Sequence, residues 1–188
     1  MRTTLALLAL LGATGCSDST PAADSGAHIR ETAPPCTIAD HATVAGCAQV
    51  VGQSFTCLPA DHLPETDAGI SYSETPPSSG PHWPFWEQTW GEHSDVVPRE
   101  RWVHNLEHGG VILLYNCPQG CDTELAVLRQ VIADRQGKRV MLTADPLLSA
   151  PRFAAVSWTW VHRTDTPDLA TLLCFVDQHE GHAPEDVP

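Results

Sequence analysis

His104-Asn-Leu-Glu-His-Gly-Gly-Val-Ile-Leu-Leu-Tyr115 is the stretch around which the rest of this chain is organised. The unbroken apolar run from Val111 to Tyr115 predicts a buried strand, because β-branched and large apolar residues favour that state. The glycine pair before it is typical of the end of a helix or a turn. We therefore expect the two histidines and the glutamate to lie in a loop or short turn that leads into a strand.

The sequence after this strand has clear helical and strand patterns. A helix is expected over residues 122–136 and a second from Thr166 onwards, with strands over 139–144 and 153–162. The resulting order is strand-helix-strand-strand-helix. It predicts an α+β domain, with a small mixed or antiparallel sheet and helices on one side, stabilised by disulfides.

The first residues have the features of a secretory signal. Arg2 precedes an apolar core from Leu5 to Leu11, and small residues follow up to position 15. Cys16 comes next, which resembles a bacterial lipoprotein signal, in which this cysteine is diacylated, for example with palmitate, and becomes the mature N-terminus. Ala13 replaces the usual leucine, so plain secretion is the alternative. We expect an exported protein, lipid-anchored to the cell envelope on its periplasmic or extracellular face.

Composition divides the chain into four parts. Residues 1–15 are the predicted signal peptide, and residues 16–35 are rich in Ser, Thr, Ala, Asp and Pro, which predicts a flexible tether. A cysteine-rich N-terminal segment follows over 36–71, and the α+β domain occupies 72–188. The chain has 188 residues and a formal net charge of −13, which argues against nucleic acid or an anionic membrane surface as partner.

Seven cysteines are present, and assigning Cys16 to lipid leaves six candidates for disulfides. They are Cys36, Cys47, Cys57, Cys117, Cys121 and Cys174. Three precede the histidine motif and three follow it, so if all six pair, at least one bridge joins the two groups. Cys174 falls opposite the apolar stripe of its helix, which favours a disulfide to a covering loop. No Cys-x-x-Cys spacing supports a thiolate metal site.

The histidine motif itself indicates metal chemistry. His104 and His108 are four residues apart, so on a helix they would share one face and could bind one divalent cation. The order H-x-x-E-H is also that of the inverted zinc peptidases, in which the glutamate is the general base. Those enzymes need the motif inside a long helix. The glycine pair and the strand therefore weaken the peptidase interpretation and leave a metal site open.

A third imidazole could come from the loop Pro76-Pro-Ser-Ser-Gly-Pro-His82. His82, His104 and His108 would form a set suited to zinc or copper(II). Glu107 could be a further ligand, a partner that fixes an imidazole tautomer, or a base acting on bound water. The alternative is that these histidines only hydrogen-bond the backbone near glycine turns.

These two motifs occur together in a bacterial family, domain of unknown function 3105 (DUF3105), and the chain resembles it. The resemblance extends from Tyr72 to Glu185, with Ala183-Pro-Glu185 similar to the family's closing motif. It implies an exported or membrane-anchored protein and carries no established activity. The two motifs that carry the resemblance place His82, His104, Glu107 and His108 at positions shared by the family.

Three functional hypotheses follow. The first is an envelope lipoprotein that binds zinc or copper through His82, His104 and His108, with a role in metal binding or handling rather than turnover. The second is a metal-dependent hydrolase with Glu107 as general base. The third is a non-catalytic envelope interaction domain whose histidines are structural.

Overall fold

The computed structural model describes residues 36–66 and 69–185, and within these the strands form one mixed sheet. Strands β2, β3 and β4 are parallel to one another, whereas the β3–β5, β5–β6 and β6–β1 pairs are antiparallel. The α+β prediction with a mixed sheet is confirmed. The strand order across the sheet is β1 (Gln53–Ser54), β6 (Trp160–Thr164), β5 (Phe153–Ser157), β3 (Val111–Tyr115), β4 (Val140–Ala144) and β2 (Gly91–Glu92).

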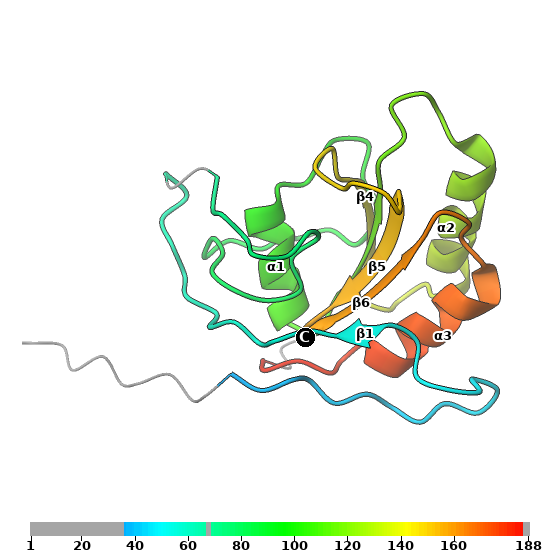
Figure 1. Cartoon of the computed structure of the whole chain (residues 1–188), viewed down its shortest axis with the longest axis horizontal. Helices are drawn as coiled ribbons and strands as arrows, with labels where there is room; N and C mark the ends of the chain where they lie inside the picture. Colours follow the sequence, from blue (N-terminus) through cyan, green and yellow to red (C-terminus); the bar gives the residue numbers. More distant parts are fainter. Residues whose placement is uncertain (1–35, 67–68, 186–188) are drawn as a thin grey trace, which may run out of the picture. The chain divides into compact units, whose positions relative to one another are not determined.

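Helices cover both faces of the sheet (Figure 1). The two helices predicted from sequence, α2 (Asp122–Asp134) and α3 (Leu169–His179), pack on one face, as expected. A third helix, α1 (Arg99–Glu107), packs on the opposite face, where its buried apolar residues meet Ile112 and Leu114 of β3. The alternation of side chains along β3 supplies both cores, because successive residues point to opposite faces.

Helix α1 corrects the expectation that the histidine motif lies in a loop or short turn. His104 to Glu107 form the last turn of this nine-residue helix. Trp102, Val103 and Leu106 are completely buried, but His104 and Glu107 are buried as well. The helix therefore lacks the polar outer face from which helices are usually recognised, and its periodicity is hidden in the sequence.

The single strand expected over 153–162 is wrong, because β5 and β6 are two antiparallel strands joined by a tight turn. Thr159 in this turn has φ 65°, and its backbone N–H donates to the carbonyl of Ser78. The apolar pattern continues through the turn because Trp158 and its neighbours remain buried. Helix α3 starts at Leu169, three residues later than expected, because the carboxylate of Asp168 caps it by accepting from the Thr171 N–H.

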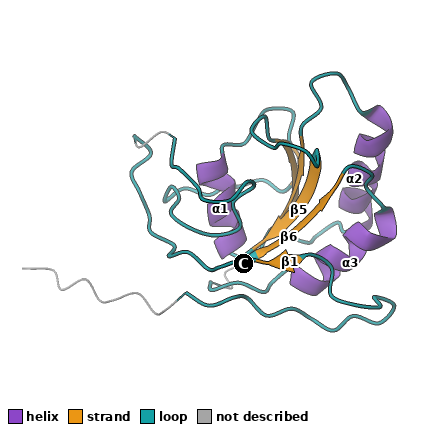
Figure 2. Ribbon diagram, in the orientation of Figure 1, coloured by secondary structure: helices purple, strands orange, loops and turns teal. Residues whose placement is uncertain are grey.

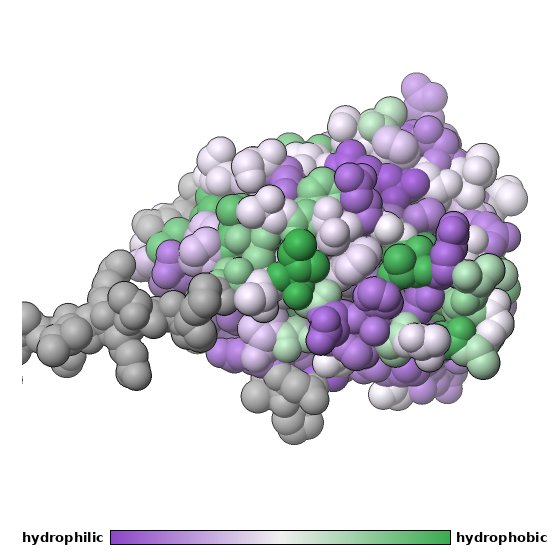
Figure 3. All heavy atoms as spheres, turned by 60° about the horizontal axis from the view of Figure 1, so that its bottom comes forward, coloured by the Kyte–Doolittle hydropathy of each residue, from purple (hydrophilic) through white to green (hydrophobic). Residues whose placement is uncertain are grey.

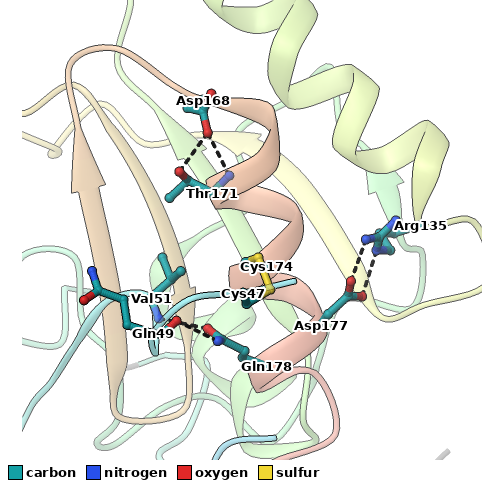
Figure 4. Close-up of a disulfide and its surroundings, with 9 residues drawn as sticks. All are labelled: Cys47, Gln49, Val51, Arg135, Asp168, Thr171, Cys174, Asp177 and Gln178. Atoms are coloured by element: carbon teal, nitrogen blue, oxygen red, sulfur yellow. Dashed lines mark hydrogen bonds and ion pairs between the residues drawn. A yellow bond between two sulfur atoms is a disulfide. The ribbon is translucent and has the colours of Figure 1, made fainter. Parts of the chain in front are cut away.

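Three disulfides link the six described cysteines: Cys36–Cys57, Cys47–Cys174 and Cys117–Cys121. The predicted bridge between the early and late cysteines is Cys47–Cys174, and it ties a covering loop to α3, as expected (Figure 4). Beside it, the Gln178 amide accepts from the Val51 N–H at 2.8 Å and donates to the Gln49 carbonyl at 2.9 Å. The cysteine-rich segment is thus attached to the body of the domain by covalent and hydrogen bonds.

Long loops, rather than further helices, surround α1 in the described part of the chain (Figure 2). No helix among residues 36–66 and 69–185 is long and apolar enough to cross a membrane. The predicted signal peptide, Cys16 and the tether lie outside the described residues. The loops around α1 bring the candidate site together.

Candidate metal centre

Four side chains from three separate segments meet beside α1. Ligand atoms of His62, His82, His104 and Glu107 all lie within 4.8 Å of one another. The last three are buried, with exposures of 0%, 5% and 4%, whereas His62 is exposed on one side. We call these four residues the first group.

The glycine pair determines how α1 ends and therefore where His104 and Glu107 point. Gly109 has φ 79°, a left-handed conformation that side chains rarely adopt and that closes helices. At Gly110 a Cβ atom would lie 2.6 Å from the ring of Trp90 and 2.8 Å from the Asn105 carbonyl oxygen. Only glycine fits at this position, so the motif requires Gly109 for its backbone conformation and Gly110 for packing.

His82 is held in position by its own loop. Its Nδ1 donates to the carbonyl of Gly80, 2.9 Å away, and its Nε2 lies 3.0 Å from Oε2 of Glu107. The loop is fixed in turn, because the hydroxyl of Ser79 accepts from the Leu58 N–H at 3.0 Å. The ring therefore presents Nε2 to the centre of the group.

His104 repeats this arrangement from the helix. Its Nδ1 donates to the carbonyl of Trp83 at 2.8 Å, so no backbone group engages its Nε2, which lies 3.1 Å from Nε2 of His108. In metalloproteins a ligating histidine almost always donates its second ring N–H to a carbonyl or carboxylate, which fixes the tautomer. Both His82 and His104 thus have only one nitrogen engaged by the backbone, and the other is directed inward.

His62 was missed by sequence reasoning. A short parallel bridge brings it to the site: the Leu63 N–H donates to the His82 carbonyl at 2.8 Å and the His82 N–H donates to the Asp61 carbonyl at 3.0 Å. Its Nε2 lies 3.5 Å from Oε2 of Glu107, and its ring stacks on that of His104 with centroids 4.9 Å apart. No local motif marks His62, because its position depends on this long-range pairing.

His108 lies beside the first group rather than in it. Its Nε2 is 3.1 Å from Nε2 of His104 and 3.4 Å from a carboxylate oxygen of Glu185. Its ring makes a T-shaped contact with Trp86, with centroids 4.5 Å apart. Together with Glu107 and Glu185 it forms another set of three ligand atoms within 4.8 Å of one another. We call these three residues the second group. Glu185 was noticed in the sequence only as part of a closing motif.

Residues 64–188, more than half of the chain, match the family described as Protein of unknown function (DUF3105). The chain belongs to this family. His82, His104, Glu107, His108 and Glu185 lie inside the matched DUF3105 region, and His62 lies just before it. No curated protein and no solved structure matches the chain.

The charge states in this DUF3105 site suit metal ligands. Burial lowers the pKa of His104 to about 4, assisted by the neighbouring histidines and opposed by its hydrogen bond to Trp83. Burial alone would raise the pKa of Glu107, but the hydrogen bond from His82 and the surrounding imidazoles together lower it. At neutral pH His104 is therefore neutral and Glu107 ionised, the forms in which these side chains bind metals.

The donor set fits a borderline transition metal. Imidazole and carboxylate donors suit zinc in tetrahedral sites, and imidazole sets also suit copper(II). The six cysteines of the described chain are all engaged in disulfides, so thiolate ligands do not compete. The His and Glu side chains of the first group could therefore hold a metal ion.

Proposed function

We propose that this DUF3105 protein binds a transition metal, zinc or copper, through His62, His82 and His104, with Glu107 as the carboxylate at the same centre. The observation that carries the proposal is that His82 and His104 each donate Nδ1–H to a backbone carbonyl, while ligand atoms of both lie within 4.8 Å of those of His62 and of the buried, ionised Glu107. Of the sequence-predicted set, the geometry supports His82, His104 and Glu107. It favours His62 over His108 as the third imidazole.

The alternative of a purely structural cluster is weaker on physical grounds. Burying His82, His104 and Glu107 costs solvation free energy, and apolar residues of similar volume would pack without that cost. A large apolar patch on the surface would support the hypothesis of a non-catalytic interaction domain. On the face drawn in Figure 3, hydrophobic residues instead stand in separate patches among hydrophilic ones.

Metal analysis of tag-free protein tests the proposal. The oxidised protein is stripped with a chelator, reloaded with Zn²⁺ or Cu²⁺, desalted and analysed for bound metal. We expect tight binding in the wild type and loss of affinity in His82→Ala and His104→Ala. In His93→Ala, which alters a surface histidine outside both groups, binding should persist. Absence of both metals from the reloaded wild type would overturn the proposal.

A hydrolase is the second candidate, and one observation favours it. Glu107 lines a cleft of ≈ 950 Å³, together with Asp61, Trp158 and Glu185. If the three imidazoles alone held zinc, Glu107 would be free to accept a proton from a bound water beside this cleft. Glu107→Gln separates the two candidates: a base variant keeps its metal and loses hydrolysis, whereas a ligand variant loses metal.

We also propose that the protein is a lipoprotein of the cell envelope, anchored by diacylated Cys16. The proposal rests on the basic start, the short apolar core and the cysteine after the small residues. Fractionation of cells that express the full chain tests it. The wild type should be found with membranes, and Cys16→Ser should remain a soluble precursor or secreted protein. Equal membrane association of both forms would contradict lipid anchoring.

A further inference from the structure

The second group contains two ligands that the proposed centre does not use, His108 and Glu185, and it shares Glu107 with the first group. Glu107 is the last residue of α1, His108 follows it, and Glu185 comes from the C-terminal segment. The backbone holds this segment in place, because the Glu185 N–H donates to the Glu107 carbonyl at 3.1 Å. The three residues therefore meet through a specific backbone contact and not only through flexible side chains.

His108 is a buried imidazole with unsatisfied hydrogen-bonding capacity. It is 9% exposed, and its Nδ1 has no hydrogen-bond partner although the atom is buried. Its Nε2 is 3.1 Å from Nε2 of His104, and such a contact needs a proton on one of the two nitrogens. Two metal ions bound one to each ring would replace that shared proton.

Glu107 connects the groups, since it contributes a ligand atom to both. A carboxylate has two oxygens and can bridge two cations, and two-metal sites hold their ions about 3.5–4 Å apart. The first group offers three imidazoles, whereas Glu185 adds a second carboxylate on the other side. Glu107 and Glu185 also line the cleft of ≈ 950 Å³, so the second group is reached from solvent.

We propose that this centre is dinuclear: Glu107 bridges a metal ion in the first group and a second divalent cation held by Glu107, His108 and Glu185. The second cation has only three protein ligands and keeps open coordination positions that face the cleft. This inference rests on the proposed metal-binding function and adds a second ion to it.

The test counts metal ions with Zn²⁺ as the probe. Stripped full-chain protein is titrated calorimetrically, and bound zinc is then measured after desalting. The wild type should bind two equivalents of zinc, and Glu185→Gln and His108→Ala should each bind one, with the tight site retained. Glu65→Gln is a matched control, because its side chain is 51% exposed against 52% for Glu185, and it should still bind two.

Each other result has a distinct meaning. One equivalent in the wild type, unchanged in Glu185→Gln, would overturn the second site and leave the proposed function intact. Loss of the single tight site in His108→Ala would also overturn it, because His108 would then belong to the first metal. No bound zinc or copper in any form would overturn both proposals. Circular dichroism of each variant tests whether it is folded, and the half-exposed side chain of Glu185 makes Glu185→Gln the milder change of the two.

Discussion

Nε2 of His82 lies 3.0 Å from Oε2 of Glu107, although 25 residues separate the two along the chain. His82 comes from a proline-rich loop and Glu107 from the end of α1. The His82 ring is completely buried, and its other nitrogen is bonded to its own loop. This contact joins the two sequence motifs of the family into one centre.

Glu107→Gln should lower zinc affinity while preserving the fold. The amide has nearly the same shape but removes the negative charge that stabilises a bound cation. We expect zinc affinity to fall by at least roughly 10–100-fold, because that is the usual loss when a group that merely orients a metal ligand is removed. Competition with a chromophoric chelator measures the change. Glu87→Gln alters a carboxylate outside both groups and should keep wild-type affinity; an equal loss there would mean that the effect is not specific.

His62→Ala should weaken zinc binding with little effect on folding. Its side chain is 46% exposed, so its removal leaves no large cavity, yet its Nε2 lies among the ligand atoms of the first group. We expect a loss of affinity of at least about tenfold and an unchanged melting temperature without metal. Equal affinity in His62→Ala and wild type would show that His62 is not a ligand, and it would also count against a hydrolase whose zinc is held by three imidazoles alone.

Removing the Cys47–Cys174 disulfide should destabilise the protein more than removing Cys117–Cys121. The first bridge joins residues 127 apart and the second residues 4 apart. Loop-closure entropy gives upper values of about 5 and about 2 kcal/mol for the free energy of unfolding. Urea denaturation of the two double-alanine variants compares them. Similar losses in both would indicate that the short bridge stabilises the native state in some other way.

Stability should fall on acidification because of His179. Burial lowers its pKa from an ordinary 6.5 to about 4, and its ring is 1% exposed. Below about pH 6.5, His179 therefore binds a proton in the unfolded chain but not in the native state. The stabilising contribution is complete above that pH and decreases as the pH falls towards about 4. The resulting loss in the free energy of unfolding between about pH 7 and pH 5 is about 2 kcal/mol.

Urea unfolding in excess chelator at both pH values measures this effect. His179→Gln is the comparison, because an amide can still donate to the Val51 carbonyl, which accepts from His179 in the wild type at 2.9 Å. The variant should lose less stability on acidification than the wild type. An unchanged pH dependence would mean that the native state accommodates a protonated His179.

Local patterns were sufficient for much of the fold. The apolar run of β3 and the helical periodicity of α2 and α3 predicted those elements, because their cores are made of contiguous, regularly spaced side chains. The position of Cys174 away from the apolar stripe of α3 correctly indicated a bridge to a covering loop. Helix α1 escaped detection because its polar residues are buried, and the β5–β6 turn because the apolar pattern runs through it.

The sequence by itself determined the strand after the glycine pair, the α+β class and the residues His82, His104, Glu107 and His108 as candidates. Only the tertiary structure decided which imidazoles converge. It brought His62 in through a backbone bridge to His82 and placed His108 beside Glu185 instead. The physical reason is that spacing along the chain controls neighbours on one helix or strand, whereas a centre built from two loops and the end of a helix depends on pairings between distant segments.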